Sequence, residues 1–218
     1  MPTHNSPKWL RFVQRYLGWI AIPNIAILIV TLQALGFLLV SSDPIWIDRL
    51  ALDPIRFQAG EYWRAITFLS LPISLSPIWV LFVLWFIYFI LNGIESIWGS
   101  FKTTFYVLIS VLFTVGVSLI LGTPVTQVTD FESTLFLAAA ALMPDMEVRL
   151  FFVLPVKMKW LGWLTLAFLF VRFLGADMNG RIYLLAIYFN YFLFFGPALY
   201  ERMKYRIRRE NFKRRMSR

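Results

Sequence analysis

The 218-residue sequence contains no cysteine and only one histidine, His4. Without cysteine, the chain can form no disulfide, no thiolate nucleophile and no cysteine-based metal site. Charged residues are also scarce, because Asp, Glu, Lys and Arg make up 15% of the chain whereas 59% is hydrophobic. Soluble domains contain about 25% charged and roughly 45–50% apolar residues. The composition therefore favours a membrane protein.

Long uncharged stretches predict six membrane-spanning helices. A helix needs about 20 apolar residues to cross a hydrocarbon core of about 30 Å. The fourth stretch is only about 16 Å long as a helix, so we expect it to lie surrounded by the other helices. The predicted spans are residues 17–40, 77–98, 103–128, 133–143, 160–174 and 182–200. An all-α, six-helix membrane domain is thus predicted over residues 17–200, between an N-terminal segment, 1–16, and a basic tail, 201–218.

The segments between these spans carry most of the charge. Residues 41–76 are predicted to form a long interfacial loop, and residues 149–159 a segment on the membrane surface. With six spans, 16 of the 21 Lys and Arg residues lie on the side that holds both termini. Cytoplasmic loops carry the excess of cations, so both termini are predicted to be cytoplasmic, which means the bacterial inner membrane if the source is prokaryotic.

The net charge of +9 does not by itself indicate nucleic acid, because nine cations fall between residues 202 and 218. Such a basic tail is attracted to anionic lipid headgroups. The expected partner is therefore the lipid bilayer, and no nucleic acid partner is predicted.

Three short motifs, in this order and at this spacing, resemble motifs of the rhomboid superfamily. They are Gly60-Glu61-Tyr62-Trp63-Arg64, Glu95-Ser96-Ile97-Trp98-Gly99 and Leu154-Pro155-Val156-Lys157-Met158-Lys159-Trp160. The resemblance implies a rhomboid-like six-helix bundle whose long first loop lies in the outer leaflet. It also implies structural roles for Trp63, Arg64, Glu95, Gly99, Pro155, Lys157 and Trp160.

Two of these residues need polar partners on physical grounds alone. Arg64 is expected to donate hydrogen bonds to loop carbonyls. Glu95 lies within an apolar stretch, where an isolated carboxylate is costly, so a partner for it is expected too.

No catalytic residue is predicted. Proteases of the rhomboid family use a serine on helix four and a histidine on helix six. Here His4 precedes the first span on the opposite side, and the sixth span offers only Tyr183, Tyr188, Asn190 and Tyr191. Tyrosine has a reference pKa of about 10 and asparagine does not titrate, so none of them is a general base near neutral pH.

The start of the fourth predicted span has two interpretations. The position of the family's serine falls near Thr129, where Thr129-Asp130-Phe131-Glu132 matches the capping-box pattern at a helix N-terminus. Alternatively, Thr129, Asp130, Glu132 and Asn190 line a polar, water-filled cavity. Ser133 and Thr134 follow as hydroxyls without a base.

Other chemistries lack their residues as well. A zinc protease needs two histidines on one helix, and all six aspartates flank the spans, so they cannot form an intramembrane aspartyl pair. No metal and no cofactor are expected. Small residues, namely Ala138 to Ala141 with Gly93, Gly99, Gly116 and Gly122, predict close helix packing.

The leading hypothesis is a non-catalytic rhomboid-like protein, similar to the pseudoproteases and derlins, that binds transmembrane segments of client proteins. The first alternative is a rhomboid-type protease with an unusual nucleophile. The second is a small transporter or lipid-handling protein that uses Asp130, Glu132, Asn190 and Arg172. The sequence specifies neither a client nor an oligomeric state.

Overall fold

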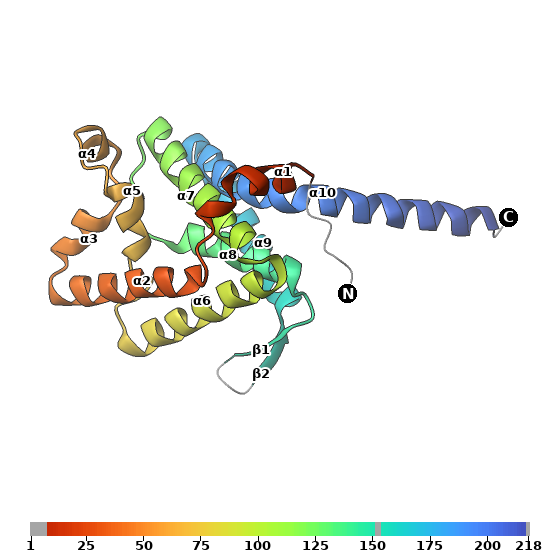
Figure 1. Cartoon of the computed structure of the whole chain (residues 1–218), viewed down its shortest axis with the longest axis horizontal. Helices are drawn as coiled ribbons and strands as arrows, with labels where there is room; N and C mark the ends of the chain where they lie inside the picture. The colour runs from red at the N-terminus through yellow and green to blue at the C-terminus, as the bar shows by residue number, and fades with distance from the viewer. Residues whose placement is uncertain (1–7, 151–153, 217–218) are drawn as a thin grey trace.

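The computed structural model describes residues 8–150 and 154–216, and most of them are helical (Figure 1). Four helices in the described chain are both long and apolar enough to cross a membrane. They have 18 to 22 residues, or about 27–33 Å at 1.5 Å per residue, which matches the bilayer core. This agrees with the prediction of a helical membrane protein. The four are α2 (Ile25–Ser42), α6 (Pro77–Trp98), α7 (Ser100–Leu121) and α9 (Met158–Gly175).

The other two predicted spans fall in helices of unusual length. Helix α8 (Thr129–Leu142) has 14 residues, whereas α10 (Met178–Met216) has 39 and carries its apolar half directly into the basic tail. Figure 1 shows the end of α10 projecting beyond the rest of the molecule as a single rod. Among the described residues, four of the six predicted spans are therefore helices both long and apolar enough to cross a membrane.

Two predicted boundaries were wrong. The first span was expected from residue 17, but α1 (Lys8–Leu17) and a short 3-10 helix, η1 (Gly18–Ile20), precede a break before α2. Pro23 disfavours the helical conformation of the residue before it, and Asn24 is left-handed, with φ of 54°. The third span was expected to reach residue 128, but α7 ends at Leu121 because Gly122 is left-handed.

The two loops with dense charge are structured. The first loop contains α3 (Ile45–Leu50), α4 (Pro54–Gln58), α5 (Arg64–Thr67) and the 3-10 helix η2 (Phe68–Ser70). The segment expected at the membrane surface contributes to an antiparallel hairpin of β1 (Glu147–Leu150) and β2 (Leu154–Lys157). The purely all-α prediction was therefore incomplete.

Helix α8 is the centre of the fold. It packs against α6, α7, α9 and α10, and Leu135, Ala138 and Ala139 on it are fully buried. This confirms that the short helix is surrounded by others. Within the described chain, α6 and α9 both pack on α8 but share no contact of similar extent with each other.

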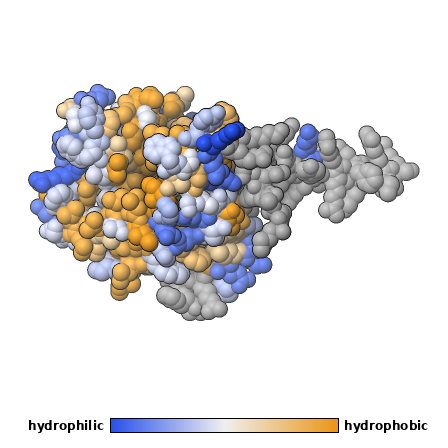
Figure 2. Space-filling view, in the orientation of Figure 1, coloured by the Kyte–Doolittle hydropathy of each residue, from blue (hydrophilic) through white to orange (hydrophobic). Residues whose placement is uncertain are grey.

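The outer surface of the bundle is apolar. Only 11% of the residues in the apolar window of α9 are buried, against 39% in that of α7, so α9 is the most peripheral of the four long apolar helices. Figure 2 shows hydrophobic residues across the middle of one face, with hydrophilic ones at the end that carries α3 and α4 and again on the opposite side of the bundle. Such a band suits contact with lipid.

Candidate functional site

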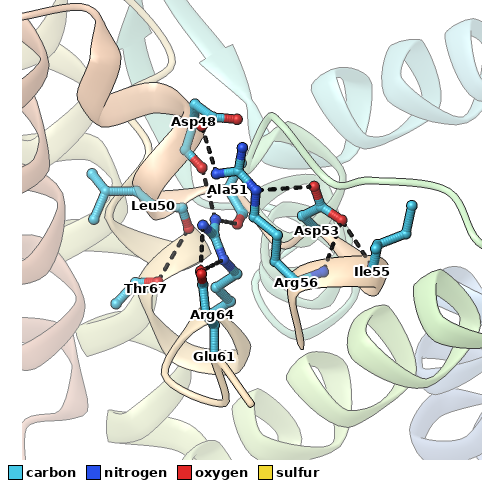
Figure 3. Close-up of polar contacts among 9 residues, drawn as sticks. All are labelled: Asp48, Leu50, Ala51, Asp53, Ile55, Arg56, Glu61, Arg64 and Thr67. Carbon is cyan, nitrogen blue, oxygen red and sulfur yellow. Dashed lines mark hydrogen bonds and ion pairs between the residues drawn. The ribbon is translucent and has the colours of Figure 1, made fainter. Parts of the chain in front are cut away.

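Arg64 holds the first loop together. Its side chain is 2% exposed, and Nη1 donates hydrogen bonds to the carbonyl oxygens of Asp48 and Ala51, both at 2.7 Å. Its Nε donates to Glu61 Oε2 at 2.6 Å (Figure 3). The predicted bonds to loop carbonyls are thus confirmed. Its neighbour Trp63 points outward and is 57% exposed.

Glu95 joins two turns at the other end of the bundle. Its Oε1 accepts hydrogen bonds from the amide of Asn24 at 3.1 Å and from the Ser100 hydroxyl at 2.6 Å. Gly99 separates α6 from α7 with a φ of 80°. The expected polar partners of Glu95 are therefore the Asn24 amide, at the break before α2, and the Ser100 hydroxyl, at the start of α7.

The remaining motif residues lie along the hairpin and the start of α9. Pro155 pairs with Arg149, and Lys157 pairs with Glu147, in the register of β1 and β2. Trp160 is 63% exposed on α9. These residues belong to β2 and α9, whereas Arg64 begins α5 and Glu95 lies near the end of α6.

The predicted capping box at the start of α8 is wrong. The N-cap is Val128, which has no side-chain capping bond. Glu132 does not turn back to the helix start but is 6% exposed inside the bundle, where it accepts a hydrogen bond of 2.5 Å from Gln33 Nε2 of α2. The Thr129 hydroxyl donates a long hydrogen bond of 3.5 Å to Gln127 Oε1. Glu132 therefore makes a hydrogen bond to α2 in place of the predicted bond to the start of its own helix.

A polar cluster connects α8, α9 and α10. Asp130 forms an ion pair with Arg172 of α9, with Oδ1 and Nη1 2.5 Å apart. One turn later, Ser133 Oγ donates to the Asp130 carbonyl at 2.8 Å and is hydrogen-bonded to the Tyr188 hydroxyl of α10. Three helices are therefore joined at the N-terminal end of α8.

Asn190 belongs to a second, deeper network. It is fully buried, and its Nδ2 donates to Ser110 Oγ at 2.5 Å and to the Tyr106 carbonyl at 3.3 Å. The Tyr106 hydroxyl in turn donates to the Thr134 carbonyl at 2.9 Å. This network fixes α7, α8 and α10 against one another, because buried polar groups need partners.

The structure has a pocket of about 330 Å³ next to the polar cluster. It lies between the α7–α8 loop and the α9–α10 turn, and backbone bonds between Leu52 and Val125 tie its wall to the first loop. Of the predicted cavity residues only Asp130 lines it, so Thr129, Glu132 and Asn190 do not share this pocket. Its lining residues are Thr123, Pro124, Val125, Thr126, Gln127, Asp130, Asp177, Asn179, Gly180 and Tyr183.

The chemistry available to Ser133 is limited by its neighbours. Its hydrogen-bond partners in the described chain are a backbone carbonyl and a phenol, and a phenol with a reference pKa of about 10 does not take a proton from serine near neutral pH. The Asp130 carboxylate is engaged by Arg172. Residues 8–150 and 154–216 contain no group of three or more potential metal ligands, and His4 lies outside these ranges.

Helix α8 also has a feature that the sequence analysis missed. Between residues 131 and 140, every side chain is buried except Ser133, Phe136 and Ala140, which are three and four residues apart. Residues at this spacing share one face of a helix. We call the partly exposed face the α8 stripe; it comprises Asp130, Ser133, Phe136, Ala140 and Met143.

The two neighbours of the α8 stripe are α6 and α9. Phe136 packs against Phe86 of α6, with ring centroids 5.8 Å apart. A Cβ atom at Gly162 of α9 would lie 2.7 Å from the Ala140 Cβ, so α9 also approaches the stripe closely. The spacing of small and apolar residues in α8 could have indicated this face, but which side faces the core depends on the tertiary contacts.

These features define the class of protein: a helical, membrane-type bundle around a short central helix with a polar cluster at one end. No family model, no curated protein and no solved structure matches the chain.

Proposed function

We propose that the chain is a non-catalytic, rhomboid-like membrane protein that binds transmembrane segments of client proteins. Three observations support the proposal. The motifs at Arg64, Glu95 and Pro155 resemble those of the rhomboid superfamily in order and spacing. Arg64 and Glu95 hold turns together, and Ser133 has a phenol and not an imidazole beside it.

In this proposal the chain crosses the bilayer six times, through α2, α6, α7, α8, α9 and α10, with both termini in the cytoplasm. The excess of cations on the side of the termini supports this orientation. The absence of cysteine makes the test simple. A cysteine replacing Asn179 should react with an impermeant maleimide added outside the cell, and one replacing Lys204 should not; the reverse pattern would overturn the orientation.

The observation that carries the proposed function is the α8 stripe. Phe136 and Ala140 are partly exposed on the central helix between α6 and α9, and α9 is the least buried spanning helix. A single client helix could pack against this face. Small residues such as Ala140 let helix backbones approach closely in membranes, where van der Waals packing drives association.

Site-specific photocrosslinking tests client binding. A benzophenone amino acid replacing Phe136 in native membranes should crosslink a defined set of intact single-span proteins. Phe192 on α10 provides a matched control, since it is also a phenylalanine and is 56% exposed on another side. If the two positions capture the same proteins in equal yield, the α8 stripe is not a client site.

A further inference from the structure

We propose that the pocket beside α10 binds the headgroup of a phosphatidylethanolamine lipid, with Asp177 contacting the ammonium and Arg172 the phosphate. This inference does not depend on client binding. It rests on the charges around the pocket and on the surface of α9 that leads to it.

The pocket itself offers oxygen atoms. Its lining provides carboxylates, hydroxyls and side-chain amides, and none of the described lining residues is a lysine or an arginine. Asp177 is exposed, and its Oδ1 accepts a hydrogen bond from the Gly180 amide at 3.0 Å. No ion pair of Asp177 occurs in the described chain, so its second oxygen can accept a bond from an ammonium group.

Arg172 supplies the opposite charge at the edge of the pocket. It is paired with Asp130, which lines the pocket, yet its side chain remains 40% exposed. A guanidinium has five N–H donors, so it can bind a phosphate oxygen while keeping Asp130. The Arg172 guanidinium and the carboxylates of Asp130 and Asp177 together fit a zwitterionic headgroup better than a purely anionic one. The two carboxylates would repel a purely anionic headgroup.

Helix α9 offers a track for the acyl chain. Trp160, Leu164, Phe168 and Arg172 are four residues apart, so they form one ridge that runs at an angle to the helix axis. Trp160, Leu164 and Phe168 are 63%, 68% and 64% exposed. The ridge is therefore apolar along its length and cationic at the end next to the pocket, which is the order of groups in a phospholipid.

Native mass spectrometry of the purified full-length protein tests the proposal. Phosphatidylethanolamine, phosphatidylcholine and phosphatidylglycerol with identical acyl chains are offered in equal amounts. We expect the ethanolamine lipid to be retained roughly fivefold over the other two, which fits one partly exposed charge-assisted hydrogen bond. The trimethylammonium group of phosphatidylcholine cannot donate a hydrogen bond, and the glycerol group of phosphatidylglycerol has no charge. Equal retention of the three lipids would overturn the proposal.

The decisive variant is Asp177→Asn. Asparagine can still accept the Gly180 amide bond, so the start of α10 is kept and only the charge is lost. The Asp177→Asn variant should retain the three lipids equally. Asp145→Asn is the control, because this carboxylate is exposed too but pairs with Lys159 at the other end of α9, and its preference should stay. A preserved preference in Asp177→Asn would contradict the assignment.

Discussion

Gly36→Ala should destabilise the protein by about 3 kcal/mol, which corresponds to a fall in Tm of about 6–12 °C for a chain of this size. A Cβ atom at Gly36 would overlap the backbone carbonyl of Ser70, because α2 packs directly on η2. Backbone cannot rotate away as a flexible side chain can, so the two segments must separate. Thermal unfolding of the purified protein in detergent measures the effect.

Gly116→Ala is the matched control for this prediction. Gly116 also lies within a spanning helix, α7, but a Cβ there would meet no atom within 4 Å. Alanine is a better helix former than glycine by up to about 1 kcal/mol, so Tm should be unchanged or slightly higher. If both variants unfolded at the same temperature, the close packing of α2 on η2 would be contradicted.

Arg64→Met should be similarly severe. Methionine keeps an unbranched, flexible chain but removes every donor, leaving the Asp48 and Ala51 carbonyls and the Glu61 carboxylate without their partner. Breaking a buried pair by removing one member costs about 3–5 kcal/mol. Because the Glu61 side chain is 35% exposed and can be hydrated, we expect about 3 kcal/mol, measured by the same thermal unfolding.

Arg56→Met provides the comparison in the same loop. Arg56 pairs with Asp48 at 2.6 Å, but both side chains are well exposed. The hydrogen bond to Asp48 raises the pKa of Arg56. The Arg56 guanidinium is charged near neutral pH with or without that bond, so the pair adds no pH dependence to the stability of the protein near neutral pH. Surface pairs contribute little, and Tm should not change measurably. An equal loss in both variants would contradict the central role of Arg64.

The sequence predicted the features that depend on local chemistry. Helix α6 begins at Pro77 and ends at Trp98 as expected, because proline favours a first helical turn and a glycine with positive φ follows the last. The short, surrounded helix α8 was predicted from its length. The hydrogen bonds from Arg64 to loop carbonyls were also predicted, and a polar partner for Glu95 was predicted from the cost of an isolated carboxylate.

Features that depend on distant partners were not predictable. Glu132 matched a capping pattern, but Gln33, 99 residues away in the chain, binds it instead. Gly36 was not singled out as a packing glycine, whereas Gly116 was, because only the position of Ser70 distinguishes the two. The α8 stripe likewise depends on where α6 and α9 lie, which no periodicity within α8 specifies.

The most direct test of the non-catalytic account is a cleavage assay in liposomes. The purified protein is reconstituted with a single-span client identified by crosslinking, and the client is followed by gel electrophoresis and mass spectrometry. We predict that the client stays intact with the wild-type protein and with Ser133→Ala alike. Cleavage within the membrane segment that is lost in Ser133→Ala would contradict the account, because it would require a base beside Ser133 stronger than the Tyr188 phenol.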